Sequence, residues 1–307
     1  MNSDRPSTQR IVWTLVGWGV GLIAVGALLF AIAWGLTPKA VTAPAPGSES
    51  SATVVATQSA APTTLPQPAT APTPAVPATV ATHVASVPAT RTVTTGILSG
   101  KIIAIDAGHQ LHGDNSLEPI GPGSNIRKPK VAGGATGVAT HQSESSVNLA
   151  VALKLRDALI AKGAHVVMIR TMQNVNISNS ERAKIANAAH AELFVRLHCD
   201  GSTDHSQSGL STLVPGSNQW TKPIVSESGL AGSYVNNAVI AATGARNRGI
   251  VKRADLSGFN WSTVPTVLVE MGFLSNAAED RQLATSAYQT KLATGLAAGI
   301  TAYLQSR

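Results

Sequence analysis

The chain has 307 residues and a formal net charge of +7, and its single cysteine, Cys199, excludes an internal disulfide bond and any paired-cysteine metal site. No cluster of Lys and Arg interleaved with aromatic residues occurs, so the composition argues against a nucleic-acid partner. A modest positive charge suits an anionic polymer better.

The first 36 residues predict a membrane anchor. Residues 11–36 carry no charged side chain, and as a helix they would extend ~39 Å, more than the roughly 30 Å of a bilayer core. Trp13 and Trp34 lie near the two ends, where tryptophan favours the membrane interface. We therefore expect residues 1–10 in the cytoplasm, a single-pass anchor in the cell membrane, and an extracytoplasmic remainder. Secretion after cleavage of a signal peptide is the alternative.

Residues 37–98 predict a disordered linker. They consist mostly of Ala, Pro, Thr, Ser and Val, with ten prolines and only three charged residues. Such a stretch has too few large apolar side chains to form a core and is expected to stay unfolded. As a flexible coil it would extend ~45 Å on average. We expect it to tether a globular head, residues 99–307, to the membrane.

Strands and helices alternate along the predicted head. Compact apolar runs predict strands at 101–106, 164–170, 192–199, 210–215 and 266–270. Apolar spacing and capping residues predict helices at 144–162, 178–189 and 288–304. This alternation is typical of an α/β fold, a mainly parallel sheet flanked by helices on both faces. In such folds, ligands gather at the carboxyl ends of the strands.

Four side chains are expected to meet at that edge of the sheet. His109 follows the first strand, His198 and Glu270 lie at the ends of later strands, and Glu144 begins the first long helix. Two imidazoles and one carboxylate form a ligand set suited to catalytic zinc, with a fourth position left for water. Glu270 stands within PTVLVEMGFLSN, where burying an unpaired charge costs several kcal/mol. It therefore indicates either a functional carboxylate or a buried ion pair with an arginine.

Taken singly, the other three residues also have ordinary explanations. His109 suits a surface or structural position, His198 suits a packed strand end, and Glu144 suits the first turn of any helix, where a carboxylate is favoured. Glu270 favours a functional role even alone, because its neighbours are so apolar, and the combination of the four indicates a catalytic site.

The head resembles, over about 100–305, the zinc-dependent N-acetylmuramoyl-L-alanine amidases of the bacterial cell wall (amidase type 3). The matching segments, in order, are IAIDAGHQ with His109, ESSVNLAVALKLRDALIAKGAHVVMIR with Glu144, ERAKIAN at 181–187, LFVRLHCDG with His198, and VPTVLVEMGFLSN with Glu270. The resemblance implies a twisted sheet wrapped by helices.

The resemblance also implies the chemistry. His109, Glu144 and His198 would bind one Zn²⁺ per chain, and Glu270 would be the catalytic carboxylate. The substrate would be peptidoglycan, cut at the amide bond between N-acetylmuramic acid and L-alanine, in wall remodelling or daughter-cell separation. The sequence identifies no activating protein.

This chain departs from the family pattern at several positions. Ala107 and Gln110 stand where the family commonly has proline and glycine, and Ser145 stands where it commonly has lysine. The segment 110–143 is long and rich in glycine. Because this segment follows the first histidine directly, we expect a lid over the site.

Three alternatives stay open. A cysteine peptidase using Cys199 is disfavoured, because the adjacent His198 would point to the opposite face of the strand. A zinc carboxypeptidase usually has an HxxE pair, whereas His109 is followed by Gln110, Leu111 and His112. A catalytically inactive peptidoglycan-binding scaffold would keep the fold without the activity.

Overall fold

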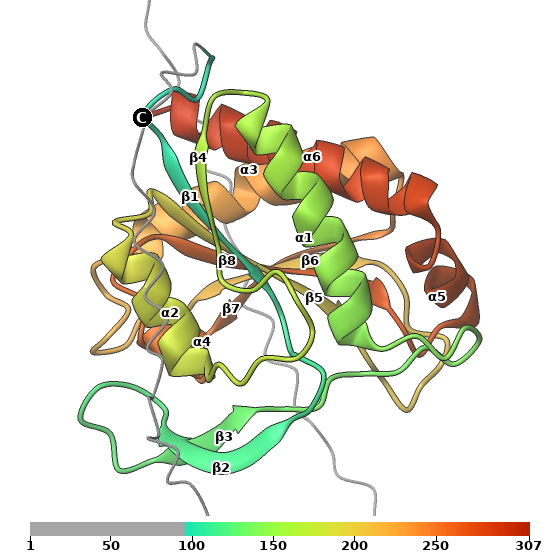
Figure 1. Cartoon of the computed structure of the whole chain (residues 1–307), viewed down its shortest axis with the longest axis horizontal. Coiled ribbons are helices and arrows are strands. Elements are labelled where there is room, and N and C mark those ends of the chain that lie inside the picture. Colours follow the sequence, from blue (N-terminus) through green and yellow to red (C-terminus); the bar gives the residue numbers. More distant parts are fainter. Residues whose placement is uncertain (1–95) are drawn as a thin grey trace, which may run out of the picture. The chain divides into compact units, whose positions relative to one another are not determined.

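The computed structural model describes residues 96–307, in which a six-stranded sheet carries helices on both faces (Figure 1). The predicted cytoplasmic segment 1–10, the anchor 11–36 and nearly all of the linker 37–98 lie outside the described residues. Within 96–307, no helix has both the length and the apolar character needed to cross a bilayer.

The sheet confirms the expected α/β class. Its spatial order is β4-β1-β5-β8-β6-β7, and every neighbouring pair is parallel except β6 with β8. The strands are β1 (Ile102–Ala107), β4 (His165–Met168), β5 (Leu193–Asp200), β6 (Leu210–Pro215), β7 (Asn247–Arg253) and β8 (Thr266–Phe273). All five predicted strands occur, and β7 is an additional one at the edge.

Glu270 lies inside its strand, whereas the sequence predicted it at the end. β8 continues to Phe273. Phe273 pairs with Asp200 of β5, so the two strands stay paired beyond Glu270. The physical reason is that the apolar run does not stop at Glu270, because Met271 and Phe273 are both buried.

Two unequal helical layers cover the sheet (Figure 1). One face packs on α1 (Glu144–Ile160), α3 (Val225–Thr243) and α6 (Ser286–Gln305), and the other carries α2 (Asn179–Ala188) and α4 (Ser257–Asn260). Alternation along β1 shows this division, since Ile103 and Ile105 join the large core while Ala104 joins the small core under α2. A further helix, α5 (Ala277–Leu283), follows β8.

Capping residues set the starts of α1 and α2, two of the predicted helices. Ser143 accepts a hydrogen bond from the backbone N–H of Ser146, so that α1 begins at Glu144. Ser178 and Glu181 form the reciprocal capping box that the sequence predicted for α2. The first of these caps matters for the site, because it presents Glu144 at the edge of the sheet.

The segment 110–143 contains an ordered hairpin, which the sequence did not predict. Its strands are β2 (Asp114–Pro119) and β3 (Arg127–Val131). Two indole N–H groups fix it to the rest of the head: Trp220 Nε1 donates to the carbonyl of Pro122, and Trp261 Nε1 donates to that of Pro119, both at 2.9 Å. The lid expected over this segment stays a prediction.

Asp280 of α5 holds the chain that leads from the hairpin into α1. Its carboxylate is fully buried and accepts hydrogen bonds from the backbone N–H groups of Ala139 and Thr140, the hydroxyl of Thr140 and the amide of Gln142. Gly137 packs so closely on this carboxylate that an added Cβ would lie 2.2 Å from Oδ1. One buried acceptor therefore helps to fix the segment that leads into α1.

Replacing Asp280 with alanine is expected to lower the free energy of unfolding by about 3 kcal/mol, because several buried donors lose a charged acceptor. Urea denaturation followed by circular dichroism measures this change. The exposed Asp157 provides the control, since Asp157→Ala is expected to stay within about 0.5 kcal/mol of the parent protein. Equal stability of the two variants would contradict the role given to Asp280.

Candidate active site

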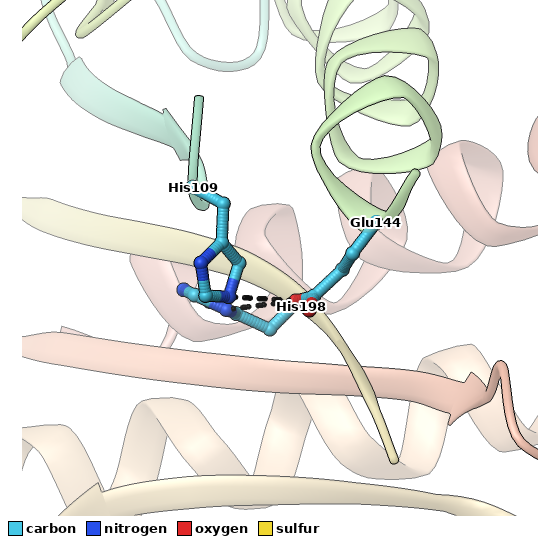
Figure 2. A group of neighbouring side chains, drawn as sticks. All are labelled: His109, Glu144 and His198. Atoms are coloured by element: carbon cyan, nitrogen blue, oxygen red, sulfur yellow. Dashed lines mark hydrogen bonds and ion pairs between the residues drawn. The ribbon is translucent and has the colours of Figure 1, made fainter. Parts of the chain in front are cut away.

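Three of the four predicted site residues come together where β1 and β5 end (Figure 2). His109 follows β1 by two residues, His198 lies near the end of β5, and Glu144 is the first residue of α1. One ligand atom from each residue lies within 4.8 Å of the others. The two imidazole rings stand nearly perpendicular, with their centroids 4.8 Å apart.

The Glu144 carboxylate is the centre of this group. Oε1 lies 3.1 Å from Nε2 of His109 and 3.1 Å from Nδ1 of His198. The backbone N–H of Ala135 donates to Oε2 and that of Cys199 donates to Oε1, at 2.8 and 3.0 Å. With only 3% of the residue exposed, the carboxylate is held from several sides.

His109 adopts a left-handed backbone conformation, with φ at 58°. This conformation is uncommon outside glycine and costs energy that neighbouring contacts must offset. Its Nδ1 lies 2.8 Å from the carbonyl of Ala132, and as a donor to that oxygen it leaves Nε2 facing Glu144. The residues after β3 thus set which nitrogen of His109 points into the site.

Two buried arginines hold the turn that carries His109. Arg182 donates to the carbonyls of Ala107 and His109, and its guanidinium also pairs with Asp106 at 2.6 Å. Arg170 donates to the carbonyls of Ala107 and Gly108. Because these guanidiniums satisfy the carbonyls of three consecutive residues, they keep the strained turn in one conformation.

Glu270 lies beside His198 on the same face of the sheet. The two residues are register partners in the parallel pair β5–β8, and both line one pocket together with His109. The pocket has a volume of about 430 Å³, and β3 of the hairpin forms one of its walls. All four predicted site residues are therefore in or around a single cavity.

Two unsatisfied polar atoms mark this cavity. In the described part of the chain, three buried side-chain polar atoms lack a hydrogen-bond partner, and two of them are Nε2 of His198 and Oε2 of Glu270. Buried polar atoms without partners are rare and need an explanation. A bound ion and a substrate in this pocket would supply the missing partners.

The local electrostatics of His198 and Glu144 suit a cation between them. Burial lowers the pKa of His198 to about 4, so this imidazole is neutral at pH 7. Burial would raise the pKa of Glu144, but its hydrogen bonds with His109 and His198 outweigh burial and hold that pKa well below the usual range. A neutral imidazole and an ionised carboxylate are the protonation states that metal binding requires.

The pKa of Glu270 is shifted in the opposite direction from that of Glu144. Its burial raises the pKa of the carboxyl well above the usual range, and the nearby Glu144 and Asp200 carboxylates add to the effect. No salt bridge of Glu270 occurs within residues 96–307, so the buried ion pair considered from the sequence is absent there. The carboxyl therefore holds a proton more readily than an ordinary glutamate does, as a group that transfers protons must.

Cys199 lies on the other face of β5, in the large core. Burial raises the pKa of its thiol well above the usual value, and its Sγ contacts the side chain of Asn148 at 3.7 Å. A buried thiol with a raised pKa is a poor nucleophile. The structure therefore agrees with the argument against a cysteine peptidase.

Three charged groups beneath the site were not predicted from the sequence, namely Asp106, Arg182 and Arg196. Asp106 and Arg196 each interrupt an apolar strand, IIAIDA and LFVRLHC, as Glu270 does in its own strand. The signal that identified Glu270 was thus present at both positions. Arg182 lies within ERAKIAN, where an arginine on a helix gives no comparable signal.

Comparisons with known proteins agree with this geometry. Residues 103–302 match the family model described as N-acetylmuramoyl-L-alanine amidase. In Bacillus subtilis, the amidase LytC is 29% identical over 66% of this chain and 36% of its own length, and the uncharacterised protein YqiI is 29% identical over 67% of this chain and 86% of its own. The crystal structure of the amidase Ami1 from Mycobacterium smegmatis superimposes with a TM-score of 0.63 at 25% identity, covering 68% of this chain and 99% of that one.

Gly108 is expected to be essential for placing the His198 ring. A Cβ at this position would lie 2.3 Å from Nε2 of His198, so Gly108→Ala must displace the imidazole. Because changes around metal ligands cost 10- to 100-fold in metal affinity, we expect Zn²⁺ affinity to fall by at least about tenfold in isothermal titration. Gly133→Ala is the control, since nothing lies within 4 Å of its added Cβ. Equal affinities of the two variants would contradict this account.

Proposed function

This chain belongs to the N-acetylmuramoyl-L-alanine amidase family, and from that membership we propose that its head uses one zinc ion to hydrolyse the amide bond between N-acetylmuramic acid and L-alanine in peptidoglycan. The observation that carries the proposal is the convergence of His109, Glu144 and His198 on one point of a pocket that Glu270 also lines. No simple packing argument brings two imidazoles and two carboxylates together there.

The three ligand residues fit zinc by their chemistry. Two imidazole nitrogens and one carboxylate oxygen are a common donor set of catalytic zinc, and the contact of His109 with the Ala132 carbonyl supplies the outer hydrogen bond that such ligands usually have. When bound, zinc supplies Lewis acidity, which activates water and polarises a carbonyl at neutral pH.

Glu270 is the general base and then the general acid in this proposal. Its Oε2 is buried without a partner in the pocket, so it can accept the proton that the attacking water loses. The same carboxyl can then deliver the proton to the nitrogen of L-alanine as the amide bond breaks. The raised pKa of Glu270 favours the second step, and a cation at the histidines opposes that rise and favours the first.

We further propose that residues 11–36 anchor the protein in the cell membrane and that residues 37–98 carry the head to the wall. The support is the uncharged apolar span, followed by a proline-rich segment with too few large apolar side chains to form a core. The net charge of +5 in residues 99–307 suits an anionic wall polymer. Cleavage of the span and secretion of the head is the competing outcome.

Mass analysis of muropeptides after digestion of purified peptidoglycan tests the proposed reaction. We expect free stem peptides that begin with L-alanine, together with glycan strands whose lactyl groups carry no peptide. A zinc carboxypeptidase would instead shorten the stem peptides and leave them attached to the glycan. An inactive wall-binding scaffold would release nothing.

Glu270→Gln is expected to lower the turnover number by at least about 100-fold in the same assay, because the amide cannot take up the proton. The variant is expected to bind zinc with a stoichiometry of about one, since Glu270 is not among the three ligand residues. Glu227→Gln, a change at a half-exposed carboxylate on α3, is the matched control. Near-normal turnover of Glu270→Gln would exclude Glu270 as the base.

A further inference from the structure

Four cationic side chains lie at or just behind the wall of the pocket, in two clusters of the same kind. In the first cluster, Arg196 lines the pocket and shares the single carboxylate of Asp106 with the deeper Arg182, at 2.9 and 2.6 Å. At the rim, Lys128 and Arg253 share the carboxylate of Asp255. Each cluster carries two cations for one carboxylate, so each offers positive charge to an anionic group of a ligand.

Arg182 is fully satisfied by the protein. A guanidinium has five N–H donors, and those of Arg182 reach five acceptors: Asp106 Oδ1, Gln110 Oε1 and the carbonyls of Ile177, Ala107 and His109. Its side chain is completely buried and does not line the pocket. Arg182 is thus a structural residue that holds the turn of His109.

Arg196 differs from Arg182 in both respects. It lines the pocket, and only two of its five donors have acceptors among the described residues, Nε with Asp106 and Nη2 with Asn179. The other three donors, including both on Nη1, are left over although only 3% of the residue is exposed. Two hydrogen bonds thus fix the position of the guanidinium, and its free N–H donors can bind a further acceptor.

Gly258 keeps the head of Arg196 in this position. An added Cβ at Gly258 would lie 1.9 Å from Nη1 of Arg196, so the glycine at the start of α4 allows the guanidinium to lie against the backbone. Leu268 of β8 is the register partner of Arg196 and lines the same pocket. The guanidinium therefore stands beside an apolar side chain, where a charge-assisted hydrogen bond is stronger than in water.

The spacing of Arg196 from the ligand residues matches the spacing within a stem peptide. Arg196 and His198 are two residues apart on β5, so they point to the same face about 6.6 Å apart along the strand. In an extended peptide, two residues also span roughly 7 Å. A carboxylate on the residue after L-alanine would therefore reach Arg196 when the scissile amide lies at His198.

We infer that Arg196 is a specificity-determining residue that binds the free α-carboxylate of the second residue of the stem peptide, next to the bond that is cut. This inference rests on the proposed function. It adds to that function a preference for stem peptides in which this carboxylate is free over those in which it is an amide. Lys128 and Arg253 at the rim draw the anionic peptide into the pocket.

Two synthetic muramoyl tripeptides test the inference, identical except that the second residue carries either a free α-carboxylate or its amide. The full chain loaded with zinc is expected to cleave the acid with a kcat/KM about 10- to 100-fold higher than the amide, chiefly through KM. In Arg196→Gln the ratio is expected to fall close to one, because cleavage of the acid loses more than cleavage of the amide. Arg196→Lys is expected to keep a reduced preference for the acid.

The control is Arg156→Gln, which removes one positive charge from the exposed side of α1 and is expected to leave the preference unchanged. A parent enzyme that cleaves both tripeptides equally would overturn the inference, and so would an Arg196→Gln enzyme that loses activity on both by the same factor. If Arg196→Gln does not fold, the comparison of the two substrates with the parent enzyme and Arg196→Lys still decides. Cleavage of neither tripeptide at the muramoyl–alanine bond would instead contradict the proposed function itself.

Discussion

The Glu144 carboxylate is the contact on which the rest of the site depends. It joins the turn after β1, the end of β5 and the start of α1, since it contacts His109 and His198 and accepts the backbone N–H of Cys199. A buried carboxylate among two imidazoles is stable only if its charge is compensated. A cation at this point satisfies the carboxylate and both rings at once. Side chains from the start of one helix and the ends of two strands therefore act together as one site.

A second set of charges lies one layer deeper and supports the first. Asp106 pairs with two arginines, and Arg182 and Arg170 satisfy the carbonyls around the left-handed His109. They give the turn a rigid support, which a catalytic geometry needs. Of this set, only Arg196 lines the pocket, and the role in substrate binding proposed above depends on that position.

The elements that could be predicted from the sequence are those with a strong hydrophobic pattern. β1, β5 and β8 are apolar runs buried on both faces, and α2 has a complete capping box. The hairpin was missed because DNSLEP and RKPKV are polar, and their order comes from tertiary bonds such as those of Trp220 and Trp261. β7 was missed for a related reason, since NRGIVKR is an edge strand whose side chains are mostly exposed.

The four site residues could be named because each breaks a local pattern at a strand end or a helix start, and because their order resembles a family. The pocket could not be predicted in the same way. Its walls come from β3 and the start of α4, which are far apart in the sequence. Lys128 of β3 pairs with Asp255, two residues before α4, across this distance. The role of Arg196 likewise depends on which of its donors are occupied, and only the folded structure shows that.

The central claim is that one metal ion is held by three distant side chains at the edge of the sheet. Anomalous diffraction at the zinc absorption edge, from crystals of the active enzyme, tests this claim most directly. We expect one anomalous peak, about 2.0–2.2 Å from a nitrogen of His109, a nitrogen of His198 and an oxygen of Glu144. An active enzyme whose zinc lies elsewhere, or which contains no metal, would contradict the account.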